Sequence, residues 1–540
     1  MSVKFSKPLP TAREDLLEQR RVSILRVPKG LEDKSARSLN PRPLSYEPGV
    51  VSLKDKLLKR PLTVLSFNSW DGGSDHIIGS EGYEQRNPSE PFFRERSINL
   101  TSIPRPHEEL AGSGQMILGK RLSQLRDEKL FVPLYDKTER TLSTKILDRP
   151  DLMEYLRHEA AGGPAVISAY KSAVRVREVA DKLGITLIGA NEGKDKYGHK
   201  DWAGIIFDRA GVRYPLQTET VKDVDGLSQE IARLLPKLPD HSTVMIKHVD
   251  STSGNGVAPL DVSSIPAEVR KNEAETTARV KQLLLDSKTL DVTAMPHPEF
   301  VSRFKDGVLA QEYIPFTLSP SGQRYIDEAH RSHYVSTGVQ VLNDGKIYKG
   351  AMSGAPEDLQ KMLVTDTQKI GGVLAKLGVT GNFGVDFLAK PKTGGGWDLY
   401  ACEINIRRLG TTHPVEMMSA LFGGSFGKDG FFHTRDGRKL AYEITDSVGE
   451  EGLPEPQNYE KFVGLTSADA YDLAARHGML ANDRSSEGIW PNMTVLLREY
   501  GKSGALAYAP TLERANGLLH DWKHVLTDAA AQRRPPKATG

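Results

Sequence analysis

The stretch GNFGVDFLAKPKTGGGWDLYACEINIRRLGTTHP, residues 381–414, is the most informative part of this chain. Two apolar runs, 383–388 and 399–406, flank a glycine-rich turn. Apolar runs joined by such a turn are typical of a β-hairpin. The stretch therefore predicts two paired antiparallel strands, each of which carries polar residues among the apolar ones.

Three side chains with oxygen donors are expected to meet on this hairpin. Glu403 and Asn405 lie two apart on one strand, so they point to the same face, and pairing can bring Asp386 beside them. An acid at a strand end is commonly a solvated turn residue, but a covered strand that holds an unpaired carboxylate is costly. Two carboxylates and an amide oxygen suit Mg²⁺. Arg407 and Arg408 follow at once, which indicates an anionic ligand over the metal.

A second segment is suited to bind that anion. A short apolar strand at 244–246 reaches a lysine and then enters a loop, 250–256, rich in Ser, Thr and Gly. Glycines let the backbone approach a ligand closely, and hydroxyl groups add donors. The loop lacks the P-loop motif, and by itself it is equally consistent with an ordinary turn. The residues that would contact phosphate are Lys247, Ser251, Thr252, Ser253, Gly254 and Gly256.

Two further segments carry weaker signals. Lys194, Lys196 and Lys200 precede a helix that ends near Gly211, where a solvated basic helix start is the simpler interpretation. The segment VLAQEYIP, residues 308–315, is an apolar strand whose end could present backbone groups to an adenine edge. An ordinary strand end is the simpler interpretation of that segment alone.

The order of these segments resembles the ATP-grasp superfamily of ATP-dependent carboxylate–amine ligases. A lysine before a helix comes first, followed by a strand lysine with a Gly/Ser loop, a Q-E-Y-I strand, an Asp in G-V-D-F, and an E-I-N strand with arginines. This resemblance covers about residues 185–425. The segments EINIRRLGTTHP and SFNSWDG (66–72) are similar to the pre-ATP-grasp branch typified by the pheganomycin-type peptide ligase, which would extend the resemblance to most of the chain beyond residue 60.

The resemblance implies roles for individual residues. Phosphate contacts would come from Lys196 and Lys247, with residues 251–256 closing over the phosphates. The adenine linker would be Gln311, Glu312, Tyr313 and Ile314, and magnesium would be held by Asp386, Glu403 and Asn405. Arg408, with Arg407, would neutralise an acyl phosphate. Two features depart from the family: Gly384 stands where many relatives have a basic residue, and the ribose contact is unassigned, with Asp327 and Glu328 as candidates.

The implied reaction is amide formation between an amino acid or related acid and an amino acid or peptide amine, with ATP and Mg²⁺ as cofactors. A small-molecule kinase and a non-catalytic nucleotide-binding regulator are the alternatives. Substrate contacts are expected at Asn68, Trp70 and Asp71, which follow a strand, and at His413. Trp70 is equally consistent with simple packing, and the T-T-H-P turn containing His413 with a structural role. Strand alternation predicts that Cys402 points away from Glu403 into the core.

Composition bounds the class of protein. The chain has 540 residues, 38% hydrophobic and 26% charged, which is typical of a soluble globular protein of three or four domains. A net charge of +2 argues against a nucleic-acid partner, and one cysteine excludes an internal disulfide. No apolar run reaches the roughly 20 residues of a membrane span, and the N-terminus lacks the apolar core of a secretory signal. We therefore expect a cytoplasmic protein; a homodimer is compatible with the resemblance.

The expected fold class is α/β: an ATP-grasp fold with an N-terminal α/β domain and a small C-terminal α+β unit. Apolar strands at 114–119, 493–501 and 504–510 and a helix at 511–530 are predicted, and the loop at 485–492 is a candidate cover for the site. The predicted organisation is a basic, partly disordered arm (1–60), a pre-ATP-grasp α/β domain (61–190), a small subdomain with the phosphate loop (191–310), a metal-binding subdomain (311–449), the C-terminal unit (450–530) and a disordered tail (531–540).

Overall fold

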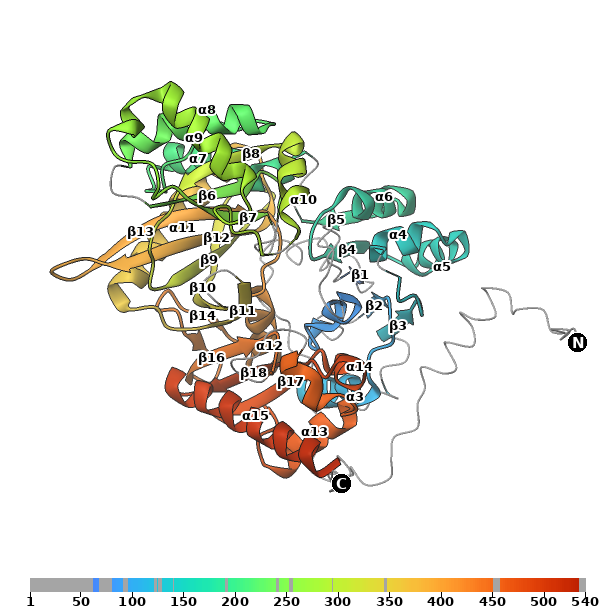
Figure 1. Cartoon of the computed structure of the whole chain (residues 1–540). Coiled ribbons are helices and arrows are strands. Elements are labelled where there is room, and N and C mark those ends of the chain that lie inside the picture. Colours follow the sequence, from blue (N-terminus) through green and yellow to red (C-terminus); the bar gives the residue numbers. More distant parts are fainter. Residues whose placement is uncertain are drawn as a thin grey trace, which may run out of the picture.

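The computed structural model describes the chain from residue 62 to residue 533. Residues 68–79, 91–95, 121–123, 125–128, 139, 190–192, 239–241, 252–255, 294, 344–346 and 450–456 are excepted. The predicted N-terminal arm therefore lies outside the described residues, as does most of the predicted tail. The described chain builds a parallel sheet and two antiparallel sheets, arranged around a common centre (Figure 1).

The first unit is a five-stranded parallel sheet in the order β3-β2-β1-β4-β5, which agrees with the predicted N-terminal α/β domain. Its strands are β1 (Thr63–Phe67), β2 (Arg96–Thr101), β3 (Lys129–Pro133), β4 (Ala165–Ala169) and β5 (Thr186–Ile188). Its helices are α3 (His107–Leu118), α4 (Leu142–Leu147), α5 (Pro150–Ala160) and α6 (Val174–Leu183). The strand order reverses between β1 and β4, the place where open α/β sheets bind ligands.

One predicted strand of this unit is wrong. Residues 114–119 form the end of α3 rather than a strand. Glu108 and Glu109 occupy the first turn of α3, where acids favour helix formation, and Leu110, Ser113 and Gly114 are buried at helical spacing. An apolar hexapeptide by itself could not reveal that period.

The second unit is a three-stranded antiparallel sheet, β7-β6-β8, covered by helices. Its strands are β6 (Thr243–His248), β7 (Val257–Asp261) and β8 (Val308–Glu312). The helices of this region are α7 (Lys200–Ala210), α8 (Val224–Leu234), α9 (Glu273–Leu285) and α10 (His297–Ser302). Lys247 therefore lies in strand β6, as predicted, and the predicted phosphate loop falls in the connection from β6 to β7.

The third unit is a large antiparallel sheet in the order β13-β12-β9-β10-β11-β16-β15-β14. Its strands are β9 (Ser319–Ile326), β10 (Ser332–Asn343), β11 (Ile347–Met352), β12 (Gly381–Pro391), β13 (Trp397–Asn405), β14 (Ser425–Phe426), β15 (Phe432–His433) and β16 (Lys439–Thr445). Helices α11 (Glu357–Lys376) and α12 (Thr412–Phe422) belong to this unit. The β12–β13 hairpin predicted from residues 381–414 is present.

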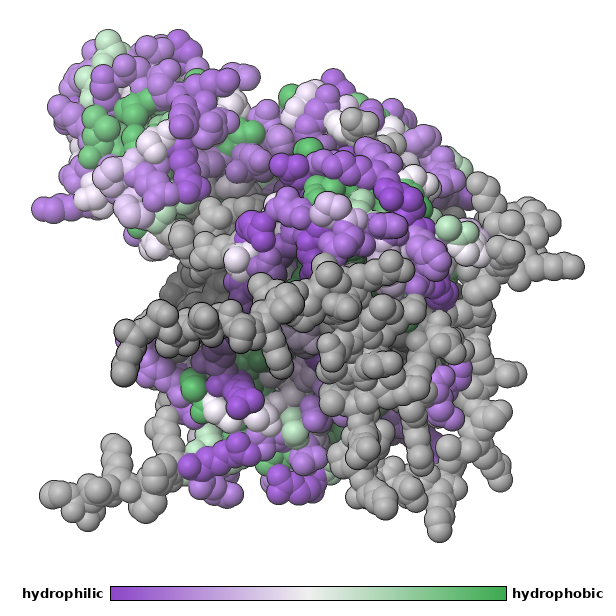
Figure 2. Space-filling view, turned by 90° about the vertical axis from the view of Figure 1, so that its right-hand side faces the viewer, coloured by the Kyte–Doolittle hydropathy of each residue, from purple (hydrophilic) through white to green (hydrophobic). Residues whose placement is uncertain are grey.

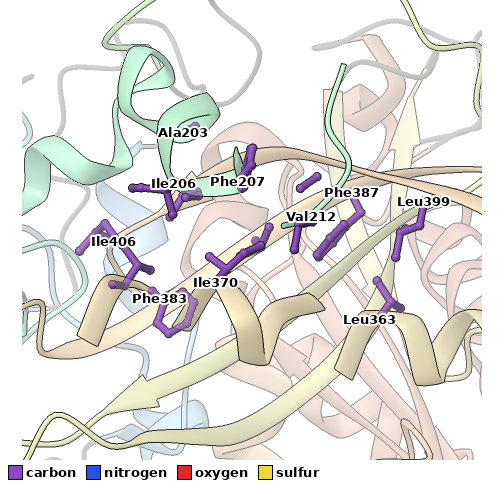
Figure 3. Close-up of a cluster of buried hydrophobic side chains, with 14 of the residues drawn as sticks. Ala203, Ile206, Phe207, Val212, Leu363, Ile370, Phe383, Phe387, Leu399 and Ile406 are labelled. Carbon is purple, nitrogen blue, oxygen red and sulfur yellow. The ribbon is translucent and has the colours of Figure 1, made fainter. Parts of the chain in front are cut away.

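A continuous apolar core fixes α7 against the β12–β13 hairpin. Figure 3 shows Ile206 and Phe207 of α7 in one cluster with Ile370 of α11 and Phe383 of β12. All four side chains are at most 1% exposed. Because α7 is held on this core, its first residue, Lys200, is fixed relative to the hairpin.

The C-terminal elements extend the large sheet. They are α13 (Ser467–Arg476), β17 (Gly488–Asn492), α14 (Leu497–Tyr500), β18 (Gly504–Ala509) and α15 (Leu512–Arg533). Strand β18 pairs with β16, and α15 packs against both strands. Two predictions are wrong here: residues 493–501 form a 3₁₀ turn and α14 rather than a strand, and the candidate cover loop contains β17.

Candidate functional site

The centre of the site is the β12–β13 hairpin, whose register pairs Asp386 with Glu403. The next pair is Phe387 with Ala401, so Cys402 is an extra residue in a β-bulge. The bulge breaks the strict alternation of the strand. The prediction from strand alternation that Cys402 is a packed core residue is therefore wrong. Cys402 is partly exposed, and its Sγ lies 3.4 Å from Nζ of Lys247.

Asp386 forms the most perturbed acid of the site. Its carboxylate accepts hydrogen bonds from Gln340 Nε2 at 2.5 Å and Asn405 Nδ2 at 2.9 Å. Burial and the neighbouring charge of Glu403 raise the pKa of Asp386 to about 7, while the charge of Arg407 acts in the opposite direction. Two carboxylates this close repel each other unless a cation or proton intervenes.

The oxygen donors fit a divalent cation. Glu403 is 28% exposed on its side chain, and the amide nitrogen of Asn405 is occupied by Asp386, which leaves the Asn405 amide oxygen as a donor. Oxygen-only donor sets of this kind suit Mg²⁺. Within the described residues there is no group of three or more His, Cys, Asp and Glu side chains arranged for a metal. A metal here would therefore rely on an amide as its third protein donor.

Two buried lysines lie beside the β12–β13 hairpin. Lys200 Nζ donates to Ser251 O at 2.8 Å and Ser251 Oγ at 2.9 Å, and it lies 3.7 Å from Glu403 Oε1. Lys247 Nζ donates to Gln311 Oε1. Burial lowers the pKa of Lys200; Glu403 opposes that effect, while the charge of Lys247 adds to it. The site thus brings two cations and two carboxylates together at low exposure.

Lys196 is the upstream phosphate lysine predicted from the sequence, but in the structure it is Lys200 that lies in this cluster. Lys196 lies outside this cluster, with Nζ 5.3 Å from the ring centroid of Tyr197 and 5.4 Å from that of Trp202. Lys200 is the first residue of α7 and shares a helical face with buried Ala203 and Phe207. That spacing of three and four residues was the available signal, because it puts Lys200 on the core side of the helix.

The loop after β6 is only partly described. Thr252, Ser253 and Gly254 lie outside the described residues. A Cβ on Gly256 would lie 2.3 Å from the Cβ of Ser251, so the returning chain can pass Ser251 only with glycine there. Ser251 is thereby held where Lys200 Nζ reaches its oxygens.

The predicted adenine linker begins in β8, the strand that pairs with β6 and its Lys247. Gln311 is buried and bonds Lys247 on one side and Gln217 on the other, at 3.3 Å. The Glu312 carboxylate accepts from the backbone N–H of Leu216 at 3.0 Å. Tyr313 is 39% exposed, and Ile314 is buried. This segment therefore carries Gln311, which is bonded to Lys247, and two residues later the exposed ring of Tyr313.

The two ribose candidates lie elsewhere. Asp327 follows β9 and bonds Arg331 and His333. It is six residues from Ser321, the partner of Asp386, which is about 20 Å along an extended strand. Glu328 is exposed next to it. Neither joins the cluster.

The two arginines have different surroundings. Arg408 is 4% exposed: its Nη2 donates to Ser168 Oγ at 2.7 Å, and its guanidinium lies 3.5 Å from Glu90 and 3.6 Å from Glu416. Its neighbour Arg407 donates to the hydroxyl of Tyr170 at 3.0 Å, and its charge acts on Asp386. Arg407, rather than Arg408, is therefore turned toward the carboxylates.

His413 lies at the start of α12, stacked on Tyr170 with ring centroids 5.8 Å apart. It is 1% exposed, and neither ring nitrogen has a hydrogen-bond partner among the described residues. Burial, with the charges of Arg86 and Arg408, holds its pKa well below the ordinary value. The other predicted substrate residues, Asn68, Trp70 and Asp71, fall outside the described residues.

Comparisons with known proteins agree with this architecture. The chain is 26% identical over 423 residues to L-propargylglycine–L-glutamate ligase of Streptantibioticus cattleyicolor, covering 75% of this chain and 80% of that protein. The structure is similar to biotin carboxylase of Campylobacter jejuni in complex with β-γ-ATP: TM-score 0.52, 11% identity, 87% of this chain and 95% of that chain. For pyruvate carboxylase of Rhizobium etli the TM-score is 0.50, at 13% identity, over 87% of this chain and 39% of that chain. No protein-family model matches.

These findings confirm the predicted ATP-grasp fold, and membership of the chain in the ATP-grasp superfamily of ligases is part of the proposal below. The finer assignment to the pre-ATP-grasp branch stays a prediction. Among the described residues, no helix combines the length and apolar character that a membrane span requires. The cytoplasmic location and the homodimer also stay predictions.

Proposed function

We propose that this chain is an ATP-dependent carboxylate–amine ligase that forms an amide bond through an acyl phosphate. The observation that carries the proposal is the gathering of Lys200, beside Glu403, and Lys247, beside Cys402, at the hairpin that pairs Asp386 with Glu403. The charge of Arg407 acts on Asp386. A triphosphate needs cations on its oxygens, and the acids can retain the metal that accompanies it. The ligase name of the relative with 26% identity supports the same class of reaction.

The nucleotide contacts are proposed as follows. Lys200 replaces Lys196 as the upstream lysine, because Lys200 lies 3.7 Å from Glu403 while Lys196 lies over aromatic rings. Lys247 is the second phosphate contact, and Ser251 lies beside Lys200 on the loop that would cover the phosphates. Residues 311–314 would bind adenine through backbone groups, with Tyr313 against the ring.

Asp386, Glu403 and Asn405 would hold magnesium, which when bound supplies positive charge to the phosphate oxygens. The raised pKa of Asp386 supports this assignment, because it indicates that the cations near the two carboxylates do not fully neutralise them. The positive charge of Lys200 offsets part of the negative charge of Glu403. We also infer that Arg407 contacts the transferred phosphoryl group, because the donors of Arg408 are directed to Ser168, Glu90 and Glu416.

The chemistry follows from the weakness of a carboxylate as an electrophile. An oxygen of the acid attacks the γ-phosphorus, and the bond to ADP breaks. The amine nitrogen then attacks the acyl carbon, phosphate leaves, and the amine loses a proton. The protein needs no nucleophile for this sequence; it must orient the reactants and stabilise the developing negative charge.

The acid and amine would lie at the carboxyl end of β4. Ser168 and Tyr170 come from that end, and Arg407 and His413 join them from the large-sheet unit. The first substrates to examine are amino acids and short peptides, with L-glutamate included because the relative's name contains it.

The test is a matrix of acids and amines in which release of ADP and of phosphate is measured. A ligase releases both only when an acid and an amine are present together. Release of ADP with a single acceptor would identify a kinase, and release of neither would identify a regulator. Glu403→Gln is expected to lower turnover by at least about 100-fold with the fold intact by circular dichroism. Wild-type turnover in that variant would contradict the metal assignment.

A further inference from the structure

A second cleft lies away from the lysines and carboxylates of the proposed ligase site. Its volume is about 580 Å³, a size that accommodates small organic molecules. Its walls come from two units: Ile103, Pro104 and Tyr135 follow strands β2 and β3, and Val495, Leu496 and Tyr500 belong to the C-terminal elements. The carboxyl ends of parallel strands, where open α/β sheets bind ligands, thus form one side of this cleft.

Tyr135 is the most unusual residue of the cleft. Its φ is +54°, a left-handed conformation that bulky side chains rarely adopt. Its side chain is nevertheless 55% exposed, so burial of the ring in the core does not explain the conformation. A strained backbone at an exposed aromatic residue is a reason to suspect a binding role.

The strain at Tyr135 is imposed by hydrogen bonds on both sides. Leu134 N–H donates to Thr101 O at 2.8 Å, and Asp136 N–H donates to Ser102 O at 3.0 Å. Buried Lys145 donates to Asp136 O at 2.8 Å and to Ser102 Oγ at 2.9 Å. These hydrogen bonds fix the backbone on both sides of Tyr135, whose exposed ring lines the cleft.

The charged rim of the cleft has an excess of positive charge. Lys137 forms an ion pair with Glu499 at 2.5 Å, which joins the two sides. Arg498 also lines the cleft; it is exposed, and its guanidinium makes no hydrogen bond or ion pair with any described residue. Arg498 is thus a cation available to an anionic group bound in the cleft.

We propose that this cleft is a second small-molecule site, which binds an aromatic carboxylate. The ring would lie between Tyr135 and Tyr500 over the apolar floor, and the carboxylate would pair with Arg498. The site is separate from the proposed ligase site, because β3 is three positions from β4 in the sheet order. Binding here is consequently measurable without nucleotide and independent of turnover.

The probes are 3-phenylpropionate and its uncharged amide, titrated into the full chain and observed by ligand NMR. For compounds of this size we expect the acid to bind with a dissociation constant on the order of 1 mM. The amide should bind about tenfold more weakly, because it lacks the charge that pairs with Arg498. No binding of the acid up to about 10 mM would overturn the proposal.

Three variants assign the binding to this cleft. Arg498→Gln should abolish the preference for acid over amide. Arg476→Gln, at an exposed position in the last turn of α13 and outside the cleft, should leave the preference unchanged. Tyr135→Gly should weaken both probes at least about tenfold without lowering Tm, because glycine adopts φ +54° without strain. Unchanged binding by Tyr135→Gly, or an unchanged preference in Arg498→Gln, would contradict the site.

Discussion

At the scale of single residues, Arg407 and Arg408 are adjacent in sequence and have opposite expected roles. Arg407→Met should lower kcat by about 100-fold or more while the free energy of unfolding changes little, since the charge of Arg407 acts on Asp386 in the proposed site. Arg408→Met should destabilise the protein by about 3–5 kcal/mol, because it removes the buried cation beside Glu416 and leaves buried Glu90 with Arg105, at 3.8 Å, as its cation among the described residues. Urea unfolding and steady-state kinetics on both variants measure the contrast. The reverse pattern would restore Arg408 as the residue at the phosphoryl group.

The lysines offer a second pair. Lys200→Met should weaken ADP binding by about tenfold or more, because Lys200 is buried beside Ser251 and Glu403. Lys196→Met is the matched control and should change the affinity by less than about twofold, since that side chain lies over Tyr197 and Trp202. Isothermal titration with MgADP measures both. Equal losses in the two variants would argue against the exchange of roles.

Asp386 predicts how pH affects metal binding. Its pKa in the folded metal-free protein is about 7, above its ordinary value of 3.8, so the folded state holds more protons than the unfolded state between those values. Stability of the metal-free protein therefore falls as pH rises through this window. Magnesium requires the ionised carboxylate, so its affinity should fall about tenfold per pH unit below pH 7. The Mg²⁺-induced rise in Tm, measured from pH 5.5 to 8.5, reports this linkage, and a rise that does not depend on pH would contradict it.

At the scale of elements, the β-bulge in β13 changes which residues reach the site. It sets Cys402 beside Lys247 rather than in the core. Bound nucleotide should therefore shield the thiol: alkylation by iodoacetamide should slow by about 100-fold when MgADP is present at 100 times its dissociation constant. Mass spectrometry of the labelled peptide measures the rate, with Cys402→Ser as the blank. Identical rates with and without nucleotide would place the thiol outside the nucleotide site.

The same elements explain what the sequence could predict. The hairpin of residues 381–414 was predictable because apolar runs and a glycine turn are local signals. The bulge was not, since alternation assumes a regular ladder, and Cys402 was misassigned for that reason. The segments 114–119 and 493–501 are short apolar runs that fit a strand or a helix equally. In the structure both are helical together with the residues beside them.

At the scale of the whole molecule, a buried polar network joins the parallel sheet to the large-sheet unit. Ser66 at the end of β1 bonds Glu90, Glu90 lies beside Arg408, and Asn87 bonds Glu416 of α12 at 2.6 Å. Arg86 pairs with Asp446 nearby. The contact between Arg408 and Ser168 spans 240 residues of sequence, and no local pattern could have indicated it. The described residues that are visible in Figure 2 are mainly hydrophilic, with small separate hydrophobic patches.

This network fixes Arg407 between the two units, so the proposed acid and phosphate sites share one rigid boundary. Sequence order was sufficient to predict the ATP-grasp fold and the acids of β12 and β13. The choice between neighbouring lysines and between neighbouring arginines needed the tertiary structure. It depends on which face of α7 is buried and on which arginine contacts Ser168 of β4.

The central claim is that the proposed ligase site activates a carboxylate as an acyl phosphate. Once an acid and amine pair supports turnover, the acid is supplied with ¹⁸O in both carboxylate oxygens, and the released phosphate is analysed by mass spectrometry. The account predicts that each amide formed transfers one ¹⁸O atom from the acid to phosphate. Phosphate free of ¹⁸O, with amide formed, would contradict the account.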